Sequence, residues 1–194
     1  MIVLASTSLT RQSMLRNASV EFEVEAPQLD ERELVRQHPE WSFEDTALQL
    51  AAAKAIEVSS RRPKAIVVGA DQVLALDDRV YSKPRNRVQC HDQLLDLRGK
   101  THLLLSGVAV AQNEQVLWMH QDTARLTMRH FTDEFIDSYL DVIGDDCMSS
   151  VGGYKIEGPG IQLFSSVEGN HFTILGLPLL PLLQKLRDLG EARS

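Results

Sequence analysis

The sequence is poor in the residues from which disulfide scaffolds and protein metal clusters are built. Its two cysteines, Cys90 and Cys147, form no CxxC pair. We expect them to be small buried side chains rather than a disulfide, a nucleophile or metal ligands. None of the six histidines has the HxxxH spacing of a zinc site. These absences argue against a histidine-based zinc enzyme.

The chain also lacks an excess of positive charge and a long apolar run. It has 27 acidic and 20 basic residues, giving a net charge of −7, whereas nucleic-acid and membrane surfaces attract a basic face. The apolar run Ile174 to Leu183 contains two prolines and is shorter than the roughly 20 residues of a membrane span. Met1 to Ala5 is too short for a signal-peptide core. We therefore expect a cytoplasmic protein that binds neither nucleic acid stably nor membranes.

What the chain does contain is an ordinary globular composition. Hydrophobic residues make up 43% and charged residues 24% of the 194 positions, enough for a full hydrophobic core. With no low-complexity linker or internal repeat, residues 1–194 are expected to form a single domain, with two lobes as the other arrangement that this length allows.

The stretch Ala65 to Leu76 combines a buried strand with a carboxylate. Its apolar run continues to Ala70, is interrupted by Asp71 and Gln72, and then resumes, which is typical of a strand buried on both faces. An unpaired carboxylate out of water costs several kcal/mol. Asp71 is therefore either a functional group that holds a cation or accepts a proton, or a structural partner of a nearby Arg or Lys.

The N-terminus has the pattern of a strand followed by a helix. Ile2 to Ala5 predicts a short buried strand, and Ser8 or Thr10 can cap a helix that runs through Arg16. Hydroxyls, backbone N–H groups and the helix dipole would then face one way, as in an anion site, with Arg11 as a donor for phosphate. An ordinary capped helix is the simpler interpretation of the same spacing.

Further along, charged residues are placed where helices and loops are expected. Val20 to Glu25 alternates as a half-exposed strand, and Gln28 to Glu31 places two carboxylates, Asp30 and Glu31, in a predicted loop. Ser42 and Asp45 resemble a capping box. Lys54 lies on the flank of the apolar stripe of the helix that follows, where a lysine must either extend to water or meet an anion.

The remainder predicts an α/β protein. The expected elements are a hairpin turn at 76–80 with Lys83 beyond its returning strand, helices at 86–97, from Thr132 to about 142 and at 177–189, and strands at 102–111, 116–129 and 161–164. Four glycines between Gly152 and Gly160 allow close backbone approach to a ligand but lack the GxGxxG spacing of a dinucleotide site.

Taken together, the motifs resemble the Maf nucleotide pyrophosphatases from one end of the chain to the other. The opening Leu-Ala-Ser-x-Ser-Pro-Arg-Arg of that family is similar to Leu4–Arg11 here. The other matching segments are Asp30-Glu31, Lys54-Ala55, Gly69–Val73, Ser82-Lys83-Pro84, Ser106-Gly107, Gly152–Gly160, Val167-Glu168-Gly169 and Gly176-Leu177-Pro178.

The resemblance implies a fold and an activity. The fold is a long, curved, mixed β-sheet flanked by helices, with two lobes around a cleft, and is related to that of the inosine triphosphate pyrophosphatases. The activity is cleavage of a nucleoside triphosphate between its α and β phosphates with a divalent metal, Mg²⁺ or Mn²⁺, and a homodimer is also suggested. By matching, Asp71 is the catalytic base, Glu31 joins Asp71 at the metal, and Ser8, Arg11, Lys54 and Lys83 bind the phosphates.

Three further positions are implied to set base specificity, namely Thr10, Gln72 and Glu157. Gln72 and Glu157 follow the branch that acts on 7-methyl-GTP, and a carboxylate suits the N–H donors of guanine and the positive charge of its methylated ring. Thr10 lacks an aromatic face for stacking on the base, worth roughly 1–3 kcal/mol. A pyrophosphatase for another modified or pyrimidine triphosphate (dTTP or UTP) is the alternative.

A third hypothesis is a nucleotide-binding regulator whose catalysis has been lost. It rests on the departures from the family pattern at Leu9, Thr10, Gln12 and Ser82. Against it, the sequence keeps Asp71 and the basic residues of the phosphate site, which a decaying site would be expected to lose first.

Overall fold

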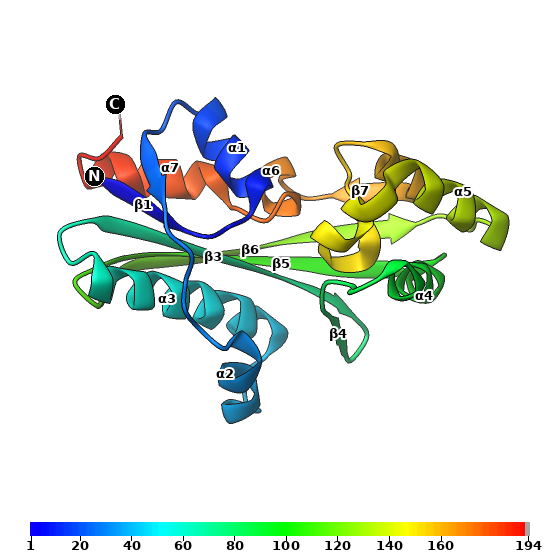
Figure 1. Ribbon diagram of the computed structural model, residues 1–194, viewed down its shortest axis with the longest axis horizontal. Coiled ribbons are helices and arrows are strands. Elements are labelled where there is room, and N and C mark those ends of the chain that lie inside the picture. Colours follow the sequence, from blue (N-terminus) through cyan, green and yellow to red (C-terminus); the bar gives the residue numbers. More distant parts are fainter. Residues whose placement is uncertain (193–194) are drawn as a thin grey trace. The chain divides into compact units, whose positions relative to one another are not determined.

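A computed structural model describes residues 1–192 of the chain, which divide into two compact units (Figure 1). The first unit comprises Met1–Gln72, Leu105–Thr123 and the chain from Asn170 onward, and the second comprises Val73–Leu104 and Ala124–Gly169. The single domain with two lobes around a cleft stays a prediction.

The strands form one mixed seven-stranded sheet in the order β2-β1-β3-β5-β6-β7, with β4 paired to β3. β1 is parallel to β2 and β3, whereas β4 is antiparallel to β3 and β7 to β6. The predicted mixed α/β fold is confirmed. The strand bounds are Ile2–Ala5 (β1), Phe22–Val24 (β2), Ile66–Leu76 (β3), Arg79–Tyr81 (β4), Thr101–Gln112 (β5), Gln115–Met128 (β6) and Phe164–Glu168 (β7).

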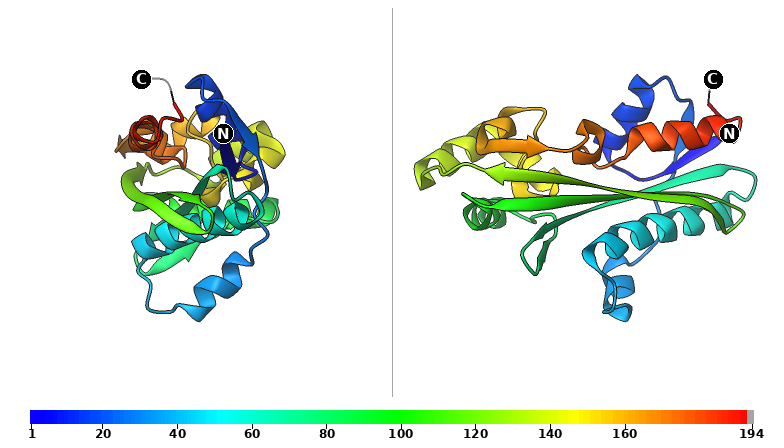
Figure 2. Two further views of the ribbon diagram at one scale, coloured as in Figure 1. Left: turned by 90° about the vertical axis from the view of Figure 1, so that its left-hand side faces the viewer. Right: turned by 180° about the vertical axis from the view of Figure 1, so that it is seen from behind.

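In the first unit the sheet is buried on both faces. Alternate residues of β1 enter different cores: Ile2 and Leu4 pack with the helices α1 (Leu9–Asn17) and α7 (Leu179–Asp188), and Val3 and Ala5 pack with α3 (Phe43–Arg61). Figures 1 and 2 show α3 on one side of these strands and α1 and α7 on the other. This period-2 division explains why the strand segments read as continuous apolar runs.

The helix starts follow the predicted capping chemistry. Ser8 caps α1 by accepting a hydrogen bond from the backbone N–H of Arg11, which decides between Ser8 and Thr10. Ser42 and Asp45 form a reciprocal capping box at the start of α3. Each cap satisfies backbone donors that the first turn of a helix leaves unpaired.

Two glycines allow α3 to lie directly on the sheet. A Cβ on Gly69 of β3 would stand 2.1 Å from the carbonyl oxygen of Ala51, and one on Gly107 of β5 would stand 2.4 Å from that of Ala47. Neither position has space for a side chain. The helix axis is therefore set close to the sheet, and residues of α3 that face it are brought against β3.

The second unit packs helices and short turns around its own strands. Its helices are α4 (Arg87–Leu97) and α5 (Asp133–Ile143), and Cys90 and Cys147 are buried free thiols, as predicted. His102 is buried with its Nε2 2.7 Å from the hydroxyl of Tyr154, and burial lowers the pKa of His102 to about 4. The described residues contain no helix that is long and apolar enough to cross a membrane.

The local structure departs from the prediction at four places. Residues 28–30 form the predicted loop, but Glu31 begins the helix α2 (Glu31–Gln37), which was not predicted and which Asp30 caps. The strand expected at 161–164 is instead a 3-10 turn followed by β7, and the short helix α6 (His171–Ile174) was not predicted. The strand expected at 20–25 is reduced to β2, where Val24 is 43% exposed because β2 lies at the sheet edge.

Replacing Gly69 with alanine should destabilise the first unit, because the added methyl group must push α3 away from β3. We expect the free energy of unfolding to fall by about 3 kcal/mol, the upper end of what overpacking costs, in chemical denaturation followed by circular dichroism.

Gly158→Ala is the matched control, since a Cβ there would lie 3.9 Å from its nearest neighbour, and its effect should stay within about 0.5 kcal/mol. Equal stability of the two variants would contradict the close approach of α3.

Candidate functional site

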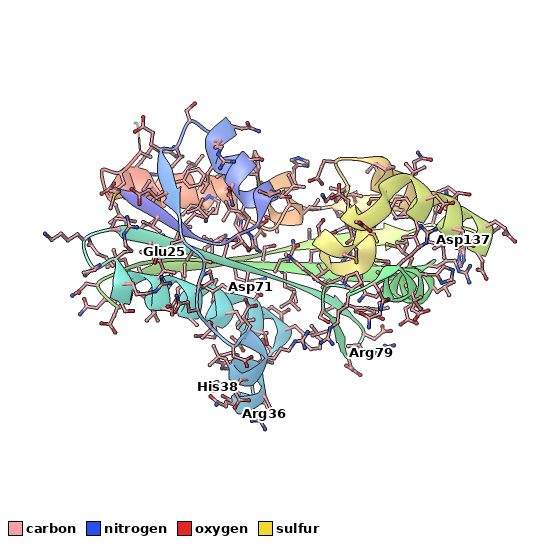
Figure 3. The ribbon with its side chains drawn as sticks, in the orientation of Figure 1. Glu25, Arg36, His38, Asp71, Arg79 and Asp137 are labelled. Atoms are coloured by element: carbon pink, nitrogen blue, oxygen red, sulfur yellow. The ribbon has the colours of Figure 1, made fainter. Side chains whose placement is uncertain are left out.

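A cluster of three charged side chains forms where α3 faces β3. Lys54 lies on the buried stripe of α3, three residues after Ala51 and four before Val58, both of which are fully buried. Asp71 lies two residues after Gly69, on the same face of β3. Figure 3 shows Asp71 between β3 and α3. The close approach at Gly69 therefore brings the lysine and the aspartate together.

Lys54 bridges two carboxylates. Its Nζ lies 2.6 Å from Oδ1 of Asp71 and 2.9 Å from Oε1 of Glu31. The side chains of Lys54 and Asp71 are 7% and 12% exposed, whereas that of Glu31 is 44% exposed. The cluster is thus buried on the β3 side and exposed to solvent on the Glu31 side.

Glu31 owes its position to the start of α2. Asp30 caps this helix by accepting a hydrogen bond from the N–H of Glu33, so Glu31 is the first helical residue. The two adjacent carboxylates therefore have different roles: Asp30 holds the helix, and Glu31 contacts Lys54. The residue pattern placed both in one loop, and only the family resemblance distinguished Glu31 from Asp30.

Burial raises the pKa of the Asp71 carboxyl, while the charges of Lys54 and Arg11 act in the opposite direction. The nearby charge of Glu31 raises it further. A carboxylate with a raised pKa is a better proton acceptor near neutral pH. Asp71 thus combines burial with the electrostatic setting of a general base.

Arg11 lies beside this cluster and is held by backbone oxygens. Its Nε donates to the carbonyl of Gly176 at 2.8 Å, and its Nη1 donates to the carbonyl of Ala70 at 2.9 Å and to the hydroxyl of Ser6 at 3.3 Å. Burial lowers the pKa of Arg11, and the charges of Asp71 and Glu31 oppose that shift. The guanidinium therefore anchors the turn after α6 to β3, next to the catalytic candidate.

Gln72 points to the opposite face of β3 from Asp71 and is held in one orientation. Its Nε2 donates to the carbonyl oxygens of Thr173 and Ile174 at 3.0 and 3.1 Å, and to Ser106 Oγ at 3.0 Å. Because carbonyl oxygens only accept hydrogen bonds, these contacts identify the amide nitrogen. The carboxamide oxygen of Gln72 is the end that can accept a hydrogen bond from a ligand.

The contacts of Gln72 were not foreseen from the sequence. Ser106 donates to the carbonyl of Thr173 at 2.8 Å, and the hydroxyl of Thr173 donates to Asp122 at 2.6 Å, so that α6 is tied to β5 and β6. Ser106 appeared only as part of a family motif, and Thr173 carried no signal because α6 itself was missed.

Of the predicted site residues in the first unit, Glu31, Lys54 and Asp71 are in direct contact, and Arg11 lies beside them. Ser8 caps α1, Thr10 is half-buried in the first turn of α1, and Gln72 faces the other side of β3. Lys83 and Glu157 belong to the second unit. Lys83 follows β4, and Glu157 is an exposed turn residue in the glycine-rich segment. The catalytic and binding roles of all these residues stay predictions.

The donor set can be compared with what a divalent metal requires. Within residues 1–192 no group of three or more His, Cys, Asp or Glu side chains could hold a metal ion. Asp71 and Glu31, joined through Lys54, supply two carboxylates. That number fits Mg²⁺, which is commonly held by one or two protein carboxylates and completes its shell with water and substrate phosphates.

The chain is similar to known proteins over almost its whole length. A family model described as Maf-like protein matches residues 1–189. The chain is 45% identical over 192 residues to a 7-methyl-GTP pyrophosphatase of Rhizobium meliloti, covering 98% of this chain and 96% of that protein. It is 46% identical over 188 residues to a protein of the same name from Brucella abortus, covering 96% and 94%.

Another relative carries a broader name. The chain is 47% identical over 187 residues to a nucleoside triphosphate pyrophosphatase of Nitrobacter winogradskyi, covering 96% of this chain and 93% of that protein. A crystal structure of a nucleoside-triphosphatase / dITP/XTP pyrophosphatase from Mycobacterium abscessus is 19% identical, with a TM-score of 0.38, over 67% of this chain and 75% of that one. That likeness is too weak to support an argument.

Replacing Arg11 with methionine should remove the donors of the Ala70 and Gly176 carbonyls. Hydrogen bonds to a charged group contribute about 1.5–3 kcal/mol, so we expect the free energy of unfolding to fall by about 2 kcal/mol in urea denaturation. Arg32→Met, an exposed position of α2, is the control and should change it by less than about 0.5 kcal/mol. Indistinguishable stabilities would show that Arg11 anchors nothing.

Proposed function

We propose that this chain, which belongs to the Maf family, is a nucleoside triphosphate pyrophosphatase that hydrolyses 7-methyl-GTP to the monophosphate and pyrophosphate. The observation that carries the proposal is the Lys54–Asp71–Glu31 cluster, with distances of 2.6 and 2.9 Å, in a chain 45% identical to a protein named for this activity. The cluster has the charge and burial that the reaction needs at its centre.

The chemistry requires no protein nucleophile. Water adds to the α-phosphorus, pyrophosphate leaves, and the proton of the water must be accepted; positioning and charge neutralisation provide most of the acceleration. Asp71, whose pKa is raised by burial, is proposed to orient that water and to accept its proton. Ser8, Arg11, Lys54 and Lys83 are proposed to contact the phosphate oxygens.

Asp71 and Glu31 are also the residues proposed to hold Mg²⁺ or Mn²⁺. Such an ion, when bound, supplies neutralisation of phosphate charge and lowers the pKa of a coordinated water. Glu31 suits this part because its side chain is 44% exposed and so open to an ion from solvent, whereas Asp71 is buried within β3.

Base recognition is assigned to Thr10, Gln72 and Glu157. The fixed amide of Gln72 leaves its oxygen as an acceptor, which matches the N–H donors of a guanine edge. Glu157 is proposed to accept from the same edge and to attract the positive charge of the N7-methylated ring. Thr10 offers no aromatic face, so stacking is not part of this proposal.

A broader substrate range is the second candidate. It is favoured by the Nitrobacter winogradskyi relative, whose name gives no base, and by Thr10, where stacking on a methylated purine is lost. Under this alternative the phosphate chemistry is unchanged, and other modified or pyrimidine triphosphates such as dTTP and UTP are also cleaved.

We further propose a cytoplasmic location, where nucleotide pools lie, and a homodimer, which light scattering would test.

Asp71→Asn should strongly reduce turnover, because the amide cannot accept the proton of the water. The variant should still fold, with lower stability, since Lys54 keeps Glu31 as its partner. We expect pyrophosphate release from 7-methyl-GTP to fall by about 10²–10⁴-fold, the range for general base catalysis, with an unchanged circular dichroism spectrum. Asp78→Asn, in the exposed turn after β3, is the control. Near-wild-type release by the Asp71 variant would overturn the assignment.

Glu157→Gln should weaken recognition of the nucleotide base and leave the contacts to the phosphates unchanged. Loss of charge-assisted hydrogen bonds of about 1.5–3 kcal/mol predicts a fall of roughly 10–100-fold in kcat/KM for 7-methyl-GTP. The same variant should turn over UTP almost as the wild type does, and Glu134→Gln, at the exposed start of α5, should affect neither substrate. An equal loss on both nucleotides would remove Glu157 from base recognition.

A further inference from the structure

Lys54 occupies the space between the two carboxylates that the proposed function assigns to the metal. One ammonium nitrogen contacts Asp71 Oδ1 at 2.6 Å and Glu31 Oε1 at 2.9 Å. The side chain is 7% exposed, so its charge is compensated by these oxygens rather than by water. In the free protein, a lysine thus stands where two ligands of a cation converge.

We propose that the ammonium group of Lys54 neutralises Asp71 and Glu31 in the free protein, in the place of a metal ion. When a metal–triphosphate binds, the Lys54 side chain leaves the carboxylates and pairs with the phosphate oxygens instead. This inference rests on the proposed function. It assigns Lys54 two successive partners, the carboxylates in the free protein and phosphate oxygens in the complex, and it makes metal binding depend on the nucleotide.

Charge and burial explain why a metal ion alone cannot easily displace the Lys54 ammonium from Asp71 and Glu31. A divalent cation bound by the same carboxylate oxygens would lie very close to the ammonium group of Lys54. The two positive charges would repel each other strongly, because they are near each other and poorly exposed to water. Displacing Lys54 without a new anion would leave a buried, uncompensated charge, which is strongly unfavourable.

A triphosphate removes that obstacle. Its oxygens give Lys54 a new anionic partner, reached by rotation of a flexible four-carbon stem, while further phosphate oxygens complete the metal shell. Metal and nucleotide therefore favour each other's binding, and by linkage each raises the affinity of the other by the same factor.

The test is titration of the protein with MnCl₂ alone, with free Mn²⁺ followed by electron paramagnetic resonance. The wild type should bind Mn²⁺ weakly without nucleotide, and Lys54→Met should bind it at least ten times more tightly, because Asp71 and Glu31 then lack their cation. Lys54→Gln is the second variant if the methionine variant does not fold. Lys64→Met, an exposed lysine beyond the end of α3, should bind Mn²⁺ as the wild type does.

A Lys54→Met/Asp71→Asn double variant tests whether the tighter Mn²⁺ binding of Lys54→Met occurs at Asp71 and Glu31. It should lose that tight binding, because one of the two carboxylates is gone. Wild-type affinity for Mn²⁺ alone equal to that of the folded Lys54 variants would overturn the proposal, as would tight binding that survives in the double variant. Because no turnover is measured, this outcome is independent of whether the chain hydrolyses 7-methyl-GTP.

Discussion

The ion pair between Lys54 and Asp71 is the constraint on which the rest of the site depends. A lysine on the buried stripe of a helix and an aspartate in a buried strand would each be costly alone, and removing one partner of such a pair typically costs about 3–5 kcal/mol. They tolerate burial because α3 lies close enough to β3 for a contact of 2.6 Å. That closeness depends on Gly69 and Gly107, whose positions leave no room for a side chain.

Much of the fold could be predicted because local rules determine it. The apolar run of β3, the capping box at Ser42 and the helix starts near Ser8, Asn86 and Thr132 depend on a few neighbouring residues, and the structure has them where they were predicted. The misses occur where no apolar periodicity marks the element. The helix α2 buries none of its residues, so the local cap at Asp30 was not recognised, and β7 follows a 3-10 turn.

The candidate site divides in the same way. Asp71 was identified as a candidate from the sequence because a carboxylate interrupts an apolar run. Lys54 was identified because it lies beside an apolar stripe. Their contact with each other was not derivable, since they are 17 residues apart on elements whose packing depends on Gly69. Gln72 was assigned to base specificity by the family resemblance. The orientation of its amide could not be predicted, because it follows from the carbonyls of Thr173 and Ile174 on a helix that was not predicted.

The cluster at Asp71 is proposed to serve cleavage of the α–β phosphoanhydride of a methylated purine nucleotide. The direct measurement is release of pyrophosphate by the wild-type chain from 7-methyl-GTP, GTP, dTTP and UTP, each with Mg²⁺ and with Mn²⁺. If the proposal holds, the products are pyrophosphate and nucleoside monophosphate, and kcat/KM is highest for 7-methyl-GTP. Release of no pyrophosphate from any of the four nucleotides, or of orthophosphate in its place, would contradict it.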